Sequence, residues 1–225
     1  MSRLRLAVFD MDGTLIDSQS LILASMRAAF AELGRAAPSD ADVLSIVGLS
    51  LPVAIARLAP GLSPAAVDRV ADLYKAAFVR LRAETGGEAT VPLYPGMRGL
   101  LEDLSRRESL LLGVATGKAR RGLDHVYAAH GIGHHFVTSQ TADTHPSKPH
   151  PAMLHAALSE TGVDPADAVM IGDTEFDMEM GRAAGMRTIA VSWGYHPVER
   201  LRAADRIVND ADGLRAALAE FEAAA

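Results

Sequence analysis

The sequence predicts an α/β fold in which a doubly wound parallel sheet carries an inserted helical module. Three observations lead to this prediction. Short, continuously apolar segments alternate with longer helical patterns, as they do in a parallel sheet whose two faces are both covered. Several of these apolar segments end directly in polar or acidic residues. One long stretch, residues 18–90, is helical in pattern and interrupts the alternation.

Six segments are expected to form the sheet. Their apolar residues run continuously instead of alternating with polar ones, which favours strands buried on both faces. The clearest are Leu6–Phe9, Leu110–Ala115, Ala168–Ile171 and Thr188–Val191, and weaker ones are Phe136–Ser139 and Arg206–Val208. Helical patterns lie between them, at Met97–Arg107, Ala119–His130, Pro151–Thr161, Glu175–Ala184 and Asp212–Phe221. This order predicts right-handed crossover connections.

The interrupting stretch is expected to be a separate helical module. Its four predicted helices are Ser18–Leu33, Ser39–Ile46, Pro52–Leu58 and Ser63–Glu84. Gly34 is a plausible C-cap of the first, and a Ser-Pro pair opens the last, as is common at helix starts. The sequence therefore predicts a core of residues 1–17 and 91–225, with a helical insert of residues 18–90 after the first strand.

Composition narrows the possible partners. The chain has 225 residues, 49% hydrophobic and 22% charged, which is enough for one large core and a smaller module. A formal net charge of −6 argues against general affinity for nucleic acid. The chain contains no cysteine, which excludes disulfides, thiolate metal sites and cysteine nucleophiles.

The sequence also predicts a cytoplasmic protein with no membrane partner. The first apolar run is too short for a signal peptide and stops at Asp10. No run approaches the about 20 apolar residues that a membrane span requires. The sequence carries no signal for an oligomeric state.

Asp10 and Asp12 are the most informative residues, because they directly follow the apolar strand Leu6–Phe9. Residues i and i+2 of a strand share a face, so extended backbone would point both carboxylates the same way. Like charges this close repel unless a cation lies between them. Gly13 permits a sharp turn, and Thr14 adds a hydroxyl group. The pattern predicts a site for a hard cation and a phosphorylated ligand, although two solvated acids remain the simpler alternative.

Three later segments carry further candidate residues. Thr116 and Gly117 end a strand and offer a hydroxyl and an open backbone N–H to phosphate oxygens, or else cap the next helix. Lys148 lies among turn residues just before a helix, where a solvated surface lysine is also a reasonable interpretation. Asp173 and Asp177 follow another apolar strand, and either of them could cap the next helix.

Together these residues indicate phosphoryl-transfer chemistry. Ligands of open α/β sheets bind at the carboxyl ends of the strands, where these side chains would meet. Several carboxylates around a phosphate need a divalent cation, and all-oxygen ligation favours Mg²⁺. One carboxylate can act as a nucleophile, and a second can protonate the leaving oxygen and then activate water.

Four motifs in this order resemble those of the haloacid dehalogenase superfamily, in the branch of phosphoglycolate phosphatases and β-phosphoglucomutases. Asp10-Met-Asp-Gly-Thr-Leu resembles the first motif and Thr116-Gly117 the second. Lys148-Pro149 resembles the third, and Gly172-Asp-Thr with Asp177 resembles the fourth. The resemblance spans nearly the whole chain. It implies a Rossmann-like core, with the helical insert in the place of that branch's cap.

The resemblance also implies roles for the acidic residues. Asp10 would be the nucleophile and a metal ligand. Asp12 would be the general acid and base, and would give the metal its backbone carbonyl. Asp173 would complete the metal shell, and Asp177 would act on it through water.

Thr116, the Gly117 amide and Lys148 would bind the transferring phosphoryl group. The implied activity is Mg²⁺-dependent hydrolysis of a small phosphorylated metabolite through an aspartyl phosphate.

Other activities of this superfamily fit the sequence less well. Asp12 argues against a dehalogenase, which has no leaving oxygen to protonate. Phosphonate-cleaving relatives need a cap lysine, and there is none between Asp17 and Tyr74. Some phosphosugar mutases carry a cap histidine, whereas the first histidine here is His125. This favours hydrolysis over a mutase. A catalytically silent binding protein on the same scaffold would lack one of the motif residues, and none is missing.

The insert is expected to select the leaving group. Candidate contacts are Gly48, Ser50 and Arg57, where an arginine could bind a carboxylate bidentately or simply be a surface charge. Phosphoglycolate, a small sugar phosphate and a nucleotide monophosphate all remain open as substrates.

Overall fold

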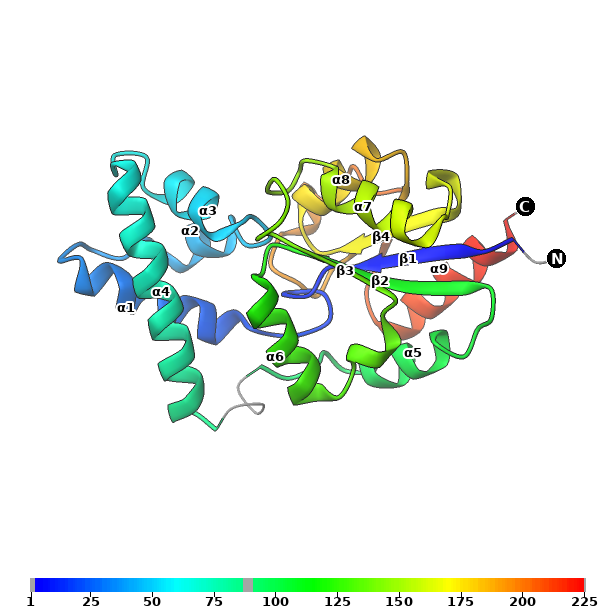
Figure 1. The fold of residues 1–225 in the computed structure, drawn as a ribbon, viewed down its shortest axis with the longest axis horizontal. Coiled ribbons are helices and arrows are strands. Elements are labelled where there is room, and N and C mark those ends of the chain that lie inside the picture. Colours follow the sequence, from blue (N-terminus) through cyan, green and yellow to red (C-terminus); the bar gives the residue numbers. More distant parts are fainter. Residues whose placement is uncertain (1–2, 87–90, 225) are drawn as a thin grey trace.

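Six parallel strands form one sheet, in the order β3-β2-β1-β4-β5-β6. The computed structural model describes residues 3–86 and 91–224 (Figure 1). The strands are β1 Arg5–Phe9, β2 Leu110–Thr116, β3 Thr138–Thr141, β4 Ala168–Gly172, β5 Arg187–Val191 and β6 Arg206–Val208. The order along the chain reverses between β1 and β4, which is where a doubly wound sheet opens a crevice for ligands. The predicted fold class is confirmed.

Alternate residues of β1 face opposite layers of helices. Leu6 and Val8 pack into a cluster with residues of α7 Ala152–Thr161 and α8 Glu175–Ala183. Ala7 and Phe9 pack on the other face, with residues of the helices α5 Met97–Leu104, α6 Arg120–His130 and α9 Ala211–Ala223. Figure 1 shows these two layers on either side of the sheet. Because helices cover both faces of the sheet, the strand sequences are continuous apolar runs.

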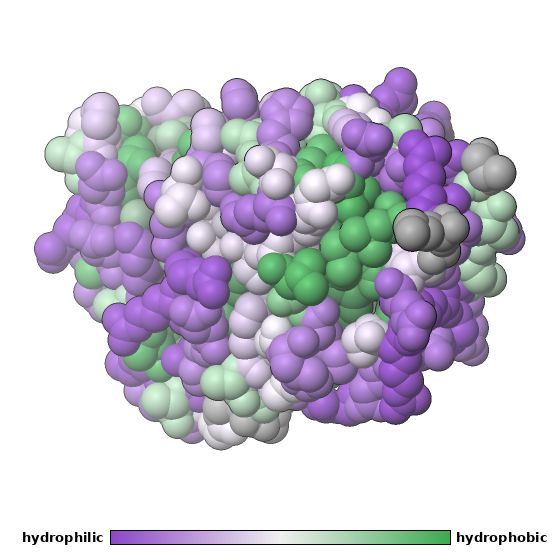
Figure 2. Space-filling model, turned by 45° about the vertical axis from the view of Figure 1, so that its right-hand side comes forward, coloured by the Kyte–Doolittle hydropathy of each residue, from purple (hydrophilic) through white to green (hydrophobic). Residues whose placement is uncertain are grey.

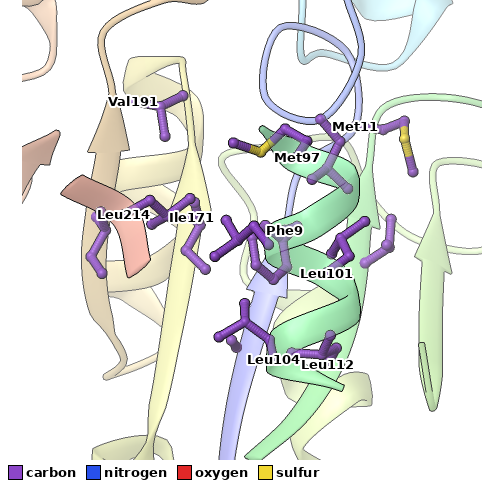
Figure 3. Packing of buried hydrophobic residues seen from close by; sticks show 14 of the residues in the cluster. Phe9, Met11, Met97, Leu101, Leu104, Leu112, Ile171, Val191 and Leu214 are labelled. Atoms are coloured by element: carbon purple, nitrogen blue, oxygen red, sulfur yellow. The ribbon is translucent and has the colours of Figure 1, made fainter. Parts of the chain in front are cut away.

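The larger cluster centres on Phe9, which is fully buried. Figure 3 shows Leu101 and Leu104 of α5 directed toward Phe9 and Leu112, with Ile171 and Leu214 on the other side of Phe9. This packing fixes the carboxyl end of β1, from which the candidate site begins.

Four of the helices between β1 and β2 precede α5: α1 Gln19–Glu32, α2 Asp40–Leu44, α3 Leu51–Leu58 and α4 Pro64–Glu84. They form a separate lobe beyond the carboxyl ends of the strands (Figure 1). The lobe has its own apolar cluster, which includes Met26, Phe30, Ile55 and Val70. We call this lobe the cap.

The chain enters and leaves the cap through two adjacent segments. The backbone N–H of Asp17 donates to the carbonyl of Pro92 at 2.8 Å, and that of Tyr94 donates to Leu15 at 3.0 Å. The predicted boundaries, a core of residues 1–17 and 91–225 and a cap of residues 18–90, remain a prediction. Residues 87–90 at the second boundary lie outside the described part of the chain.

Two predicted elements differ from the structure. The strand predicted at Phe136–Ser139 is Thr138–Thr141 instead. Phe136 stacks on Tyr127 with ring centroids 5.5 Å apart, and Val137 is exposed. These two apolar residues therefore belong to the loop before β3, and the strand itself is polar. The helix predicted at Met97–Arg107 ends at Leu104. Arg107 belongs to the turn that follows, where its carbonyl oxygen accepts a hydrogen bond from the Leu110 N–H.

Short 3₁₀ turns complete the core at Gly133–His135, Pro165–Asp167 and Val198–Arg200. The face in Figure 2 is mostly hydrophilic, with a hydrophobic area to the right of its centre. Within residues 3–86 and 91–224, no helix has both the length and the apolar character for crossing a membrane.

Candidate active site

Three strands and one loop bring the predicted core residues to the same edge of the sheet. Asp10 directly follows β1, Thr116 is the last residue of β2, and Asp173 directly follows β4. Lys148 reaches the same place from the loop between β3 and α7. The site thus lies where the strand order reverses, at the carboxyl ends of β1 and β4.

Asp10, Asp173 and Asp177 form a buried cluster whose carboxylate oxygens lie within 4.8 Å of one another. Burial raises the pKa of Asp10 to about 7, although the nearby Lys148 ammonium opposes that rise. Burial also raises the pKa of Asp173 well above its ordinary value, and the charges of Asp10 and Asp177 add to this. A cation among these oxygens would remove the repulsion that the cluster now carries.

Lys148 is the cationic member of the site, and its side chain is fully buried. Its Nζ lies 2.8 Å from Oδ1 of Asp10 and 2.7 Å from Oδ1 of Asp177. Burial lowers the pKa of Lys148, but the two carboxylates outweigh this and raise it above its ordinary value. The alternative of a solvated surface lysine is therefore wrong.

The donor set fits a hard divalent cation. Among the described residues, the two oxygens of Asp10 are the buried side-chain polar atoms that lack a hydrogen-bond partner. Lys148 is within ion-pair distance of one of them without hydrogen-bond geometry. Buried carboxylate oxygens without partners are costly unless something occupies their lone pairs. All-oxygen ligation of this kind suits Mg²⁺.

Asp173 is held in a fixed orientation. Its Oδ1 accepts a hydrogen bond from the Thr14 hydroxyl at 2.9 Å, and its Oδ2 accepts one from the Tyr195 backbone N–H at 2.8 Å. Glycine is required on both sides, because a Cβ on Gly13 or Gly194 would lie 2.2 or 2.1 Å from the Asp173 side chain. Gly13 also has a φ of +86°.

The Asp12 carboxylate is turned toward other partners. Its Oδ1 accepts a hydrogen bond from the Ser18 hydroxyl at 2.5 Å, and Lys118 Nζ lies 3.0 Å from its Oδ2. The Ser18 hydroxyl also lies 3.0 Å from the hydroxyl of Tyr195. β1 ends at Phe9, so the extended geometry expected through Asp12 does not continue, and its carboxylate is not part of the cluster of three.

Asp177 serves both the helix and the site. Its Oδ2 accepts hydrogen bonds from the Thr174 backbone N–H at 3.1 Å and from the Thr174 hydroxyl at 2.7 Å. The Asp177 backbone N–H donates to the Thr174 hydroxyl at 3.3 Å, which completes a capping box at the start of α8. The other carboxylate oxygen of Asp177 faces Lys148. Asp177 therefore helps to cap α8, as one interpretation of the sequence expected, and it also lies beside the site. Gly172 must lack a side chain, since a Cβ there would lie 2.3 Å from Cγ of Asp177.

Thr116 and Gly117 form the part of the site that touches the cap. Thr116 is buried, and its hydroxyl accepts a hydrogen bond from the Lys118 N–H at 3.2 Å. The N-cap of α6 is Ala119, so Thr116 does not cap that helix. A Cβ on Gly117 would lie 2.5 Å from the carbonyl oxygen of Gly48. The backbone of the cap therefore rests directly on this loop.

Of the cap residues predicted to contact the leaving group, Gly48 and Ser50 line the pocket and Arg57 does not. The Ser50 N–H donates to the Ser147 hydroxyl of the core at 2.8 Å. Arg57 is exposed, and its guanidinium lies over the ring of Phe176, 5.4 Å from the ring centroid. The structure thus does not bring Arg57 to the site, because its position on α3 directs it to another side of the cap.

A cavity of about 890 Å³ lies between the cap and the core. Asp10, Asp12 and Thr116 line it from the core, and apolar residues of α1 and α4 line it from the cap. Sequence reasoning missed Lys118, Ser18 and Tyr195 around Asp12, and Tyr74, Phe78 and Arg82 on α4. Lys118 directly follows a predicted motif and could have been included, whereas the α4 residues carry no local signal.

Comparisons with known proteins agree with this architecture. Residues 7–191 match the family described as haloacid dehalogenase-like hydrolase. The chain is 33% identical to the probable phosphatase IndB of Dickeya dadantii, over 89% of this chain and 86% of that protein. It is 34% identical to a phosphoglycolate phosphatase of Pseudomonas putida, over 85% and 71%. It is 33% identical to an N-acetylmuramic acid 6-phosphate phosphatase of the same organism, over 87% and 86%.

Solved structures show the same fold. A haloacid dehalogenase-like family hydrolase from Streptococcus pneumoniae superposes with a TM-score of 0.81 at 27% identity, over 97% of this chain and all of that one. A β-phosphoglucomutase from Clostridium difficile superposes with a TM-score of 0.83 at 20% identity, over 98% and 97%, which bears on the fold alone. The resemblance inferred from the four motifs is confirmed, and the chain belongs to the haloacid dehalogenase-like hydrolase family, among relatives that are phosphatases.

Proposed function

We propose that this protein is a Mg²⁺-dependent phosphatase that hydrolyses a small phosphate monoester through an aspartyl phosphate on Asp10. The observation that carries the proposal is the state of Asp10. It is buried beside Lys148 and two further carboxylates, its oxygens accept no hydrogen bond, and it lines the cavity under the cap. A carboxylate in this position is a candidate nucleophile.

Asp10 and Asp173 would hold Mg²⁺ through carboxylate oxygens, Asp12 through its backbone carbonyl, and Asp177 through water. When bound, the ion would neutralise charge on the phosphoryl oxygens and on the carboxylates around it. Lys148, whose Nζ lies 2.8 Å from Oδ1 of Asp10, would add a further positive charge beside that carboxylate.

The reaction would proceed in two displacements. An oxygen of Asp10 attacks phosphorus, and the bond between phosphorus and the leaving oxygen breaks as Asp12 donates a proton to that oxygen. Water then attacks the aspartyl phosphate after giving a proton to Asp12, which releases phosphate and restores Asp10. Thr116, the Gly117 amide and Lys148 would hold the phosphoryl oxygens throughout, so most of the catalysis is positioning and charge stabilisation.

Phosphoglycolate is a reasonable substrate to test first, because a relative 34% identical is a phosphoglycolate phosphatase. The N-acetylmuramic acid 6-phosphate phosphatase among the relatives supports testing sugar phosphates as well. A phosphosugar mutase is the alternative. It is less well supported, because the first histidine of the sequence, His125, lies on the core helix α6 and not in the cap.

The test is turnover of phenyl phosphate and a panel of phosphomonoesters by the purified protein. We expect EDTA to abolish phosphate release and Mg²⁺ to restore it. Ca²⁺ should support the reaction poorly, since its looser coordination misplaces the nucleophile. Full activity in the chelator would contradict the metal assignment. Release of an isomerised sugar phosphate in place of inorganic phosphate would favour the mutase.

A further inference from the structure

The cap wall of the cavity is apolar along one side of α4. Tyr74, Phe78 and Val79 line the cavity from that helix, and Met26 lines it from α1. Val79 is a large apolar side chain that is 46% exposed and lines the cavity. A wall of this kind has little to offer a short, fully polar leaving group, but it suits an apolar one.

Phe78 links this wall to the catalytic end of the cavity. Lys118 Nζ lies 5.2 Å from the centroid of the Phe78 ring and 3.0 Å from Oδ2 of Asp12. Arg82 follows Phe78 by four residues, so it lies on the same side of α4, about 6 Å farther along the helix axis. It also lines the cavity.

A second arginine lines the cavity together with Arg82. It is Arg121 of α6. Burial lowers the pKa of Arg82, and the positive charge of Arg121 lowers it further. Within residues 3–86 and 91–224, neither arginine has an ion-pair or hydrogen-bond partner for its side chain.

The other charged residues around the cavity already have partners. Asp124 accepts a hydrogen bond from the side chain of Arg120 at 2.9 Å, and Asp143 accepts one from the backbone N–H of Arg120 at 2.9 Å. Lys75 pairs with Asp72 at 3.3 Å. Two guanidinium groups that line one cavity, and that pair with no acid among residues 3–86 and 91–224, form a site that favours an anion.

From these contacts we propose that the preferred substrate has a leaving group with an apolar body and a second anionic group at its far end. The apolar body lies along Tyr74, Phe78 and Val79, and the anionic group binds Arg82 and Arg121. The inference rests on the proposed phosphatase function and specifies its substrate class. A cavity of about 890 Å³ supports it, since pockets of about 300–1,000 Å³ accommodate drug-sized ligands, far larger than glycolate.

The experiment compares three aryl phosphates in the full-length protein with Mg²⁺. They are phenyl phosphate, 4-(2-carboxyethyl)phenyl phosphate and its neutral carboxamide, 4-(2-carbamoylethyl)phenyl phosphate. The last two have nearly the same size, and their leaving phenols have nearly the same acidity, so their ratio of kcat/KM isolates the distant charge. We expect the carboxylate to exceed the amide by about tenfold or more, the usual effect of a charge-assisted pair.

Arg82→Gln and Arg121→Gln should each remove most of that preference. Arg80→Gln is the matched control on the same helix, because Arg80 pairs with Glu84 and does not line the cavity. It should keep the full preference.

Equal kcat/KM for carboxylate and amide in the wild type, or a preference that survives both cavity variants, would overturn the proposed substrate class. Such a result with rapid turnover of phenyl phosphate would leave the phosphatase assignment intact. Absence of Mg²⁺-dependent turnover of all three, with turnover of another phosphomonoester, would overturn this inference alone. Absence of turnover of every phosphomonoester tested would overturn the phosphatase function and this inference with it.

Discussion

The core and the cap contribute to the same cavity in opposite ways. On the core side, charged groups are buried and fixed by specific partners, as Asp173 is by Thr14 and the Tyr195 backbone. On the cap side, the wall is mostly apolar, and the side chain of Arg82 pairs with no acid among the described residues. Fixed polar groups suit a reaction step shared by all substrates, and an adaptable apolar wall suits selection among leaving groups.

This contrast makes a general prediction. Changes at the catalytic residues of the core should act regardless of leaving-group size, whereas changes along the cap wall should affect large leaving groups more than small ones. Acetyl phosphate, whose leaving group is small, is the reference substrate wherever leaving-group size is tested.

The largest effect is expected from Asp10→Asn. An amide is a poor nucleophile, so kcat should fall by more than about 10⁴-fold for aryl phosphates and acetyl phosphate alike. The fold should survive, because the change removes one charge from a crowded buried cluster. Stopped assays and circular dichroism measure the two outcomes. Borohydride trapping followed by mass spectrometry should find the wild-type adduct on Asp10, and an adduct on another residue would refute the assignment.

Asp12→Asn should have the next largest effect. Loss of a general acid and base typically costs about 10²–10⁴-fold, and the cost should be smallest for a leaving group that needs no proton. A series of aryl phosphates with increasingly acidic phenols measures this directly. The slope of log kcat/KM against phenol pKa should become steeper in the variant. An unchanged slope would show that Asp12 does not protonate the leaving oxygen.

The core residues were predictable because each one lies next to a local signal. Asp10, Thr116 and Asp173 all stand where an apolar strand ends, and parallel strands bring such ends together. Tyr195, which lies 3.0 Å from the Ser18 hydroxyl that bonds Asp12, was not predictable, because it comes from a segment much later in the chain. Only the tertiary fold brings them together.

The cap was less predictable for a related reason. Its helices follow from local pattern, but which side of a helix faces the site depends on how the cap packs on the core. Arg57 shows this: its residue type suited a substrate contact, yet it lies over Phe176 outside the cavity. Phe78 and Arg82 looked like ordinary positions of a long helix, yet both line the cavity.

Phe78→Ala and Arg57→Ala test the cap side of the comparison. Removing the Phe78 ring should lower kcat/KM for the carboxyethyl aryl phosphate by about tenfold, the usual scale for a buried aromatic contact, with a smaller change for acetyl phosphate. Arg57→Ala should leave both values within about twofold, since its side chain lies outside the cavity. Equal losses on both substrates in Phe78→Ala would make α4 a structural support and not a selective wall.

The smallest effect concerns His196, which joins the core to the cap. Its Nε2 lies 3.1 Å from the carbonyl oxygen of Ser45 in the cap, and its Nδ1 accepts a hydrogen bond from the Glu175 N–H at 3.2 Å. The neutral ring satisfies both contacts, with its proton on Nε2, whereas a protonated ring loses the acceptor.

Burial lowers the pKa of His196, and the charge of Arg200 lowers it further, although Glu175 and Asp177 oppose the shift. We expect the cap to open for substrate entry, and water would then reach the ring and return its pKa toward the ordinary value near 6.5. The open state then binds more protons than the closed state, so closure is favoured above that pH and weakens as the pH falls below it.

Between about pH 7.5 and 5.5, KM for the carboxyethyl aryl phosphate should therefore rise about two- to fivefold more than KM for acetyl phosphate. Using the ratio of the two KM values cancels the titration of the shared catalytic carboxylates. His196→Gln should remove the pH dependence of this ratio, because glutamine does not titrate. A ratio that still changes with pH in the variant would assign the effect to another group and leave His196 as a fixed contact between the two lobes.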